Sequence, residues 1–204
     1  MPNCRLKEQL IAEVIYVNID LLSTKNSVRA LCEDDIPAIY ELCSGNPQYY
    51  EYCPPPVTRE SIRADLHALP PGKTMDDKYS RGFCQKDRLI AMMDLITHFP
   101  EEGVAWIGLF MTTHDVQRQG VGSDIVWGVC NVLAPEGFRE VQLAFVKDNP
   151  QAAAFWNKAK FNAISESTND EGIVFTISSR PLFRITSATP EDAGYGSIVN
   201  HFIE

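Results

Sequence analysis

The chain has 204 residues, 45% of them hydrophobic and 22% charged, which is typical of a globular protein rather than a disordered or fibrous one. A net charge of −9 and a pI of about 4.9 argue against a nucleic acid as the main partner, because binding to a phosphate backbone needs a cationic surface.

The sequence carries no mark of a membrane or an oxidising compartment. The N-terminus does not follow the pattern of a signal peptide, and no apolar run approaches the ~18 residues of a membrane span. The cysteines are irregularly spaced and form no Cys-x-x-Cys pair; they are Cys4, Cys32, Cys43, Cys53, Cys84 and Cys130. We therefore expect a reduced, cytoplasmic protein with neither a membrane nor a nucleic acid as partner.

Two helices are predicted after a leader at residues 1–26 and a short strand at 27–31. The first begins at residues 33–37, where an aspartate can accept bonds from the free N–H groups of a first turn. Its apolar face comprises Ile36, Ile39, Tyr40 and Cys43. Residues 45–56, rich in proline and tyrosine, are predicted to be a loop. Thr58 then caps a second helix, whose apolar positions are Ile62, Leu66 and Leu69.

Three consecutive strands are predicted next, joined by tight turns. Residues 81–85 and 89–97 flank a turn at 86–88 and form a hairpin. A second turn at 100–103 leads to a third strand at 104–111.

Helices and strands alternate in the last part of the chain. A helix from Ser123 ends before Gly137, and its apolar face comprises Ile125, Val129, Val132 and Leu133. Alternation at Val141, Leu143 and Phe145 predicts a strand. A helix at 150–160 and a closing hairpin of residues 161–168 and 172–179 follow.

This order predicts an α+β fold, because the strands before the glycine-containing turn at 117–122 are joined by hairpins and only one βαβ unit follows. We expect one domain at residues 27–180, an N-terminal extension at 1–26 and a C-terminal tail at 181–204. In the tail, Pro190-Glu191-Asp192 could open a short helix.

The turn between the third strand and the helix from Ser123 predicts an anion site. The first N–H groups of a helix have no partner inside the helix, so they can point at a phosphate. Glycine lets the backbone approach that phosphate closely. The segment reads Gln117-Arg118-Gln119-Gly120-Val121-Gly122.

Together with two further segments, this turn resembles the GCN5-related N-acetyltransferase (GNAT) superfamily. The six-residue segment is similar to the family's acetyl-CoA signature, Gln/Arg-x-x-Gly-x-Gly/Ala. Asn149 and the run from Pro150 to Phe161 resemble its second block, and residues 28–37 resemble its opening. The resemblance implies a mixed, mostly antiparallel central sheet, splayed between two parallel strands, with helices on both faces. It also implies acetyl-CoA as co-substrate and no metal.

The resemblance implies three sets of cofactor contacts. The pyrophosphate would be held by the glycine turn, comprising Gln117, Arg118, Gln119, Gly120, Val121, Gly122 and Ser123. The pantetheine arm would lie along the end of the third strand, at Met111, Thr112 and Thr113. Asn149, Phe155 and Trp156 of the second block would flank that arm. Arg118 could instead be a solvated loop side chain, Asn149 a helix cap and Phe155 a plain core residue.

Two positions depart from the family pattern. Trp156 stands where many members have a tyrosine that protonates the leaving thiolate, and an indole N–H does not release its proton near pH 7. Lys160 stands at the usual glycine, which suggests a helix that ends without the left-handed glycine.

Three residues are candidates for accepting the proton of the attacking amine. Asp94 lies in an otherwise apolar strand, where a carboxylate needs a reason; its alternative is a structural role, bonded to loop N–H groups. His98 and His114 lie at strand ends, and histidine is suited to proton transfer near neutral pH, but exposed histidines are common beside turns. Tyr49, Tyr50 and Tyr52 could line an acceptor pocket or pin their loop to the core.

The sequence therefore predicts an N-acetyltransferase that transfers an acetyl group to a primary amine by direct attack in a ternary complex. The acceptor, a small molecule or a peptide, is open. A homodimer in which the leader or tail contacts a second subunit is compatible with the sequence. One rival is a non-catalytic acyl-CoA-binding or regulatory module on the same fold, and another is an unrelated nucleotide binder.

Overall fold

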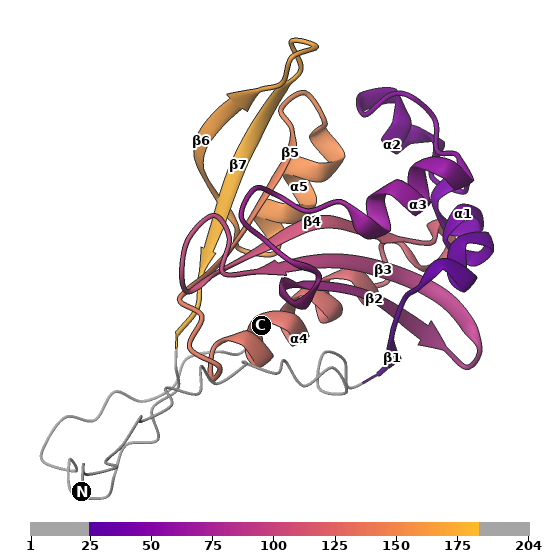
Figure 1. The fold of residues 1–204 in the computed structure, drawn as a ribbon, viewed down its shortest axis with the longest axis horizontal. Helices are drawn as coiled ribbons and strands as arrows, with labels where there is room; N and C mark the ends of the chain where they lie inside the picture. Colours follow the sequence, from indigo (N-terminus) through magenta and orange to yellow (C-terminus); the bar gives the residue numbers. More distant parts are fainter. Residues whose placement is uncertain (1–24, 184–204) are drawn as a thin grey trace, which may run out of the picture.

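The computed structural model describes residues 25–183, which form one seven-stranded sheet in the order β1-β2-β3-β4-β5-β7-β6 (Figure 1). The strands are β1 (Ser27–Ala30), β2 (Lys78–Gln85), β3 (Arg88–Thr97), β4 (Val104–Thr112), β5 (Glu140–Val146), β6 (Asn162–Thr168) and β7 (Val174–Pro181). The α-helices are α1 (Ile36–Ser44), α2 (Pro47–Tyr52), α3 (Arg59–His67), α4 (Val121–Leu133) and α5 (Pro150–Lys158). Short 3-10 turns are η2 (Glu33–Asp35), η3 (Met75–Asp77) and η4 (His114–Val116).

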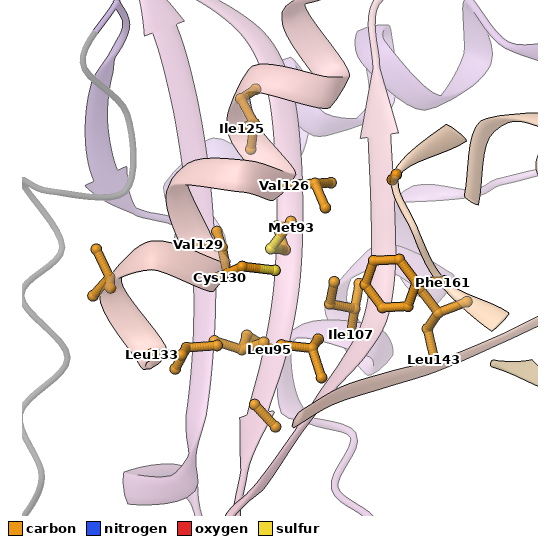
Figure 2. Close-up of a cluster of buried hydrophobic side chains, with 14 of the residues drawn as sticks. Met93, Leu95, Ile107, Ile125, Val126, Val129, Cys130, Leu133, Leu143 and Phe161 are labelled. Carbon is orange, nitrogen blue, oxygen red and sulfur yellow. The ribbon is translucent and has the colours of Figure 1, made fainter. Parts of the chain in front are cut away.

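Helices cover both faces of the sheet, and each face has its own apolar core. On one face, α4 and α5 pack against the sheet around Ile125, Val129 and Trp156. Figure 2 shows the side chains of α4 lying beside those of β3, β4 and β5 in this core. On the other face, α1 and α3 pack through Ile39 and Ile62. These two layers confirm the predicted α+β fold with helices on both faces.

The sheet is antiparallel except at one pair of strands, β4 and β5. Their parallel pairing runs only from Val104 opposite Glu140 to Ile107 opposite Leu143, although β4 continues to Thr112 and β5 to Val146. Because the last parts of the two strands are not paired, they separate toward their carboxyl ends. The predicted splay between two parallel strands is confirmed.

A bulge marks the point at which the splay begins. In the β3–β4 ladder, Asp94 pairs with Leu109 and Leu95 pairs with Ile107, which leaves Gly108 as the extra residue. A Cβ at Gly108 would lie 3.3 Å from Asp94 Oδ2. The carboxylate of Asp94 therefore lies beside the start of the separation.

Several local predictions are confirmed and several need correction. Thr58 caps α3, since its Oγ1 accepts a bond from Ser61 N at 3.0 Å. The loop predicted at residues 45–56 contains the helix α2, because Pro47 fits a first turn and two tyrosines pack on the core. Strand β2 begins at Lys78 rather than Arg81, and Tyr40 is only partly buried while Leu42 is buried.

In the closing hairpin, the second strand, β7, pairs with β5, and the first strand, β6, lies at the edge of the sheet. The helix expected at residues 190–192 lies outside the described residues, as does most of the leader. Within residues 25–183, no helix is long and apolar enough to span a bilayer.

Candidate acetyl-CoA and acceptor site

The glycine turn forms a helix N-terminus at the splayed end of β4. Gly120 is the N-cap of α4 and has φ of 83°, a backbone conformation that favours glycine. Asp124 N donates the first helical bond, to Gly120 O, at 2.9 Å. The N–H groups of Val121, Gly122 and Ser123 precede that bond, so they have no partner inside the helix and can bind an anion.

Close packing at Gly122 fixes the position of this helix end. A Cβ there would lie 3.1 Å from Phe155 Cε2 and 3.5 Å from Phe110 Cε1. The rings of Phe110 and Phe155 are stacked with centroids 5.9 Å apart, and the ring of Trp156 lies edge-on to Phe155 at 4.8 Å. A side chain at position 122 would therefore require the Phe155 ring or the helix end to shift, so the absence of one favours close approach between α4, β4 and α5.

The register of β4 determines which backbone groups face the splay. Thr113 N donates to Ile90 O on β3 at 2.8 Å, and alternate residues of an antiparallel strand point the opposite way. By this alternation, Phe110 and Thr112 turn their N–H and C=O groups away from β3, whereas Met111 turns its groups toward β3. The backbone of Phe110 is therefore better placed than that of Met111 to make the predicted contact with the pantetheine arm.

The second block lies next to this turn, because Phe155 of α5 packs against Gly122. Asn149 is the N-cap of α5, and its Oδ1 accepts from Ala152 N at 3.0 Å. Trp156 is 8% exposed and packs edge-on against Phe161 with centroids 5.1 Å apart. Lys160 has φ of 67°, so the left-handed helix end is kept by lysine instead of the family's glycine.

Side chains of the turn are held by the protein in different ways. Gln117 Nε2 donates to Asn46 Oδ1 at 2.7 Å, and Gln119 Nε2 donates to Asp115 O at 2.6 Å. Arg118 is exposed and has φ of 60°. The sequence did not single out Asn46, because its role depends on contacts with Thr112 and Gln117, which are far away in the chain.

Asp94 is engaged by two neighbours on β2. Lys78 Nζ donates to Asp94 Oδ2 at 2.7 Å, and Ser80 Oγ donates to Oδ1 at 3.0 Å. The Lys78 side chain is 1% exposed and also donates to Ala68 O at 2.9 Å. This geometry favours the structural alternative for Asp94, with a buried ammonium rather than loop N–H groups as its partner.

A carboxylate that the sequence did not single out, Asp65, lies on α3 near this ion pair. Ile62 and Leu66 are buried, so Asp65 lies on one flank of the helix and His67, which pairs with Glu33, on the other. Within residues 25–183, the Asp65 carboxylate makes no hydrogen bond or ion pair. Asp65 as a whole is exposed, but partial desolvation of its carboxyl group raises the pKa above the usual value; nearby Lys78 opposes this rise and Asp94 adds to it.

The two candidate histidines lie at opposite ends of the sheet. His114 is exposed and directly follows the splayed end of β4. His98 lies in the turn before β4, where its Nδ1 accepts from Gly103 N at 3.2 Å and its ring stacks on Phe138 at 4.8 Å. The structure therefore brings His114, but not His98, to the splay.

The candidate acceptor tyrosines lie on α2. Tyr49 and Tyr50 pack against the core under α1, with their ring centroids 5.0 Å apart, and burial raises the pKa of both hydroxyls. Tyr52 is half-buried. Figure 1 shows α2 and the β6–β7 hairpin on opposite sides of the splayed end. Tyr49 and Tyr50 thus pin α2 to the core, which was the alternative to lining an acceptor pocket.

A cavity of about 430 Å³ lies on the other flank of α3. It is lined by Leu31, Cys32, Glu33, Asp34, Leu66, His67, Met75, Lys78, Ser80 and Arg81. None of these residues belongs to the glycine turn or to the splayed ends of β4 and β5, although Lys78 and Ser80 also hold Asp94. No group of three or more potential metal ligands occurs among the described residues.

Comparison with known proteins identifies the fold and the family. The model of the Acetyltransferase (GNAT) family matches residues 38–161. An acetyltransferase from Thermus thermophilus is 19% identical, with a TM-score of 0.64 over 78% of this chain and 97% of its own. The ribosomal-protein-S18-alanine N-acetyltransferase from Escherichia coli is 17% identical, with a TM-score of 0.57 over 80% of this chain and 98% of its own.

A third solved structure contains the cofactor. RimL, a ribosomal L7/L12 alpha-N-protein acetyltransferase in complex with coenzyme A, is 17% identical, with a TM-score of 0.60 over 79% of this chain and 96% of its own. At these identities the three likenesses show a shared fold. A search of curated proteins found no match.

Proposed function

Because the chain belongs to the GNAT acetyltransferase family, we propose that it transfers an acetyl group from acetyl-CoA to a primary amine by direct attack in a ternary complex. The observation that carries this proposal is the free N-terminus of α4 at the splayed end of β4 and β5. A phosphate-binding helix end next to an unpaired strand edge offers one site for the pyrophosphate and another for the amide-containing arm.

The residues present fit acetyl-CoA. The N–H groups of Val121, Gly122 and Ser123 would bind the pyrophosphate, and Gly122 keeps this surface free of side chains. The N–H and C=O groups of Phe110 and the N–H of Thr112 would bind the pantetheine arm, and one of these N–H groups would polarise the thioester carbonyl, which stabilises negative charge on its oxygen during attack.

In this reaction, the amine nitrogen forms a bond to the thioester carbon while the C–S bond breaks and CoA thiolate leaves. A simple thiol has a pKa near ~8.5, so the thiolate can leave without an acid and take its proton from solvent. This agrees with Trp156 at the family's tyrosine position, since indole cannot supply a proton.

A free amine, with a pKa near ~10.4, must lose a proton before it attacks. We assign the acceptor of that proton to Asp65, directly or through water, because its carboxylate makes no hydrogen bond or ion pair within the described residues and lies near the pair of Lys78 and Asp94. Asp94, already bonded to Lys78 and Ser80, would fix the strand beside it. Exposed His114 is a second candidate for the proton.

The test is release of CoA thiol from acetyl-CoA with a panel of small amines, amino acids and peptides with free N-termini. We expect release that depends on one class of amine, and formation of an equimolar amount of acetylated product by mass spectrometry. Tight binding of acetyl-CoA with no turnover on any class would support a non-catalytic acyl-CoA-binding module, for which Trp156 is the motivating departure.

A further inference from the structure

We propose that Asn46 is a positioning residue that couples the glycine turn at residues 117–122 to helix α2 on the acceptor side. The inference rests on the proposed function, because it assigns a role within the same site. Asn46 itself would touch neither the cofactor nor the acceptor.

The side chain of Asn46 uses both of its donors and its acceptor. Nδ2 donates to Leu42 O at 2.9 Å and to Thr112 O at 3.0 Å, and Oδ1 accepts from Gln117 Nε2 at 2.7 Å. Asn46 is 8% exposed, so water cannot readily replace these partners. A single amide therefore joins the end of α1, the end of β4 and the first residue of the glycine turn.

The backbone of Asn46 extends this connection into α2. Its N–H donates to Cys43 O at 3.0 Å, and its carbonyl accepts from Tyr49 N at 3.1 Å. Asn46 directly precedes Pro47, the first residue of α2. A displacement of Gln117 would thus be transmitted through Asn46 to the first turn of α2.

The connection matters because Gln117 sets how the chain approaches the anion site. Arg118 and Gly120 both have positive φ, so the direction of the free N–H groups depends on a fixed start to the turn. The Gln117 side chain is held inward by Asn46, and its Nε2 also lies 3.5 Å from Thr112 O. An anion that orders the turn would order α2 through this network, and the reverse holds by thermodynamic reciprocity.

The test is hydrogen exchange of residues 47–52, measured by mass spectrometry with and without saturating CoA. We expect CoA to slow this exchange in the wild type. Gln117→Met keeps the side-chain length but removes the amide that donates to Asn46, so saturating CoA should leave the exchange of residues 47–52 unchanged. Gln48→Met alters an exposed glutamine on α2 itself and should respond to CoA like the wild type.

Calorimetric CoA binding gives a second readout. Gln117→Met should weaken CoA binding about tenfold, through loss of one buried hydrogen bond and an unsatisfied Asn46 Oδ1, whereas Gln48→Met should stay within about twofold. Asn46→Asp, isosteric but without donors, should also lose the exchange response. If Asn46→Asp does not fold, Gln117→Met decides alone.

The coupling is refuted if CoA binds the wild type without slowing exchange in residues 47–52, or if Gln117→Met responds equally. Either result leaves the proposed acetyl transfer intact. A wild type whose α2 responds to CoA but which acetylates no amine would support the coupling and refute the transfer.

Discussion

At position 160, a lysine adopts the left-handed backbone conformation with which α5 ends. Its φ is 67°, and Phe161 N closes the helix end by donating to Trp156 O at 3.0 Å. The family pattern has glycine here because glycine adopts positive φ without a steric cost. The departure therefore changes the stability of the helix end but not its geometry.

We expect Lys160→Gly to stabilise the protein by about 0.5–1 kcal/mol, since relief of left-handed strain exceeds the extra entropy of glycine in the unfolded chain. Thermal unfolding should show a rise in Tm of roughly 1–4 °C for a chain of this size. Lys158→Gly, in the last turn of the same helix, is the matched control and should lower Tm. An equal fall for both variants would contradict this account of Lys160.

The electrostatic setting of Asp65, which suits the proposed role as proton acceptor, should also lower the stability of the protein at neutral pH. Its pKa is raised, first by partial burial, so folding favours the protonated form. The stability that Asp65 contributes is therefore fully present below its unfolded pKa of ~3.9 and declines as pH rises through the folded pKa.

We expect Asp65→Asn to raise Tm near pH 7, with the gain disappearing below about pH 4, where both side chains are neutral. The same variant should acetylate amines at least about tenfold more slowly near neutral pH, because the proton acceptor is lost. Asp170→Asn, in the exposed β6–β7 turn, should change neither property. Unchanged amine acetylation in Asp65→Asn would shift the assignment to His114.

At the scale of elements, the site depends on how closely α4, β4 and α5 approach one another. Gly122 permits that approach, and the stacked rings of Phe110 and Phe155 occupy the space beside it. The free N–H groups of α4 can only face a ligand at the splay if this packing is kept. A single methyl group at the contact should therefore affect the ligand more than the fold.

Gly122→Ala places a Cβ 3.1 Å from Phe155 Cε2, so the ring or the helix end must shift. We expect CoA affinity, measured by calorimetry, to fall about tenfold, which corresponds to about 1.4 kcal/mol. Gly172→Ala is the control: it forces alanine into φ of 81° in the distant hairpin turn, so it should lower Tm without changing CoA affinity. Equal CoA affinities for Gly122→Ala and the wild type would show that packing at Gly122 does not control CoA binding.

At the scale of the whole molecule, ligand binding should appear as stabilisation of the entire domain. The sheet is continuous from β1 to β6, and the proposed ligand site joins its two halves at the β4–β5 splay. A ligand that binds only the folded state therefore shifts the unfolding of the whole domain.

CoA at about 100 times its Kd should stabilise the protein by about 2.7 kcal/mol, which raises Tm by roughly 5–11 °C for a chain of this length. ATP and NAD should raise Tm much less at the same concentration, because they offer phosphates to the helix end but lack the pantetheine arm that matches the unpaired edge of β4. A shift with ATP or NAD and none with CoA would favour an unrelated nucleotide binder.

The sequence by itself determined the parts of this protein that local rules control. Alternation and helical spacing predicted strands β3 to β5 and helix α4, and the two glycines after β4 predicted the anion-binding helix end. Thr58 and Asn149 were identifiable as caps because a cap satisfies N–H groups only a few residues away. Resemblance to the GNAT family then supplied the ligand that this helix end would bind.

Only the tertiary structure decided which distant residues meet. The bond between Asn46 and Gln117 and the pairing of Lys78 with Asp94 depend on contacts between elements far apart in the chain. The same contacts leave Asp65 without a hydrogen-bond partner among residues 25–183. A polar residue in an apolar strand looks the same in sequence whether it serves catalysis or a buried ion pair. Its role depends on the side chain that it contacts in the folded protein, and that contact is not visible in the sequence. The sequence thus predicted where the acetyl donor would bind, whereas packing decided which side chains are free to serve an acceptor.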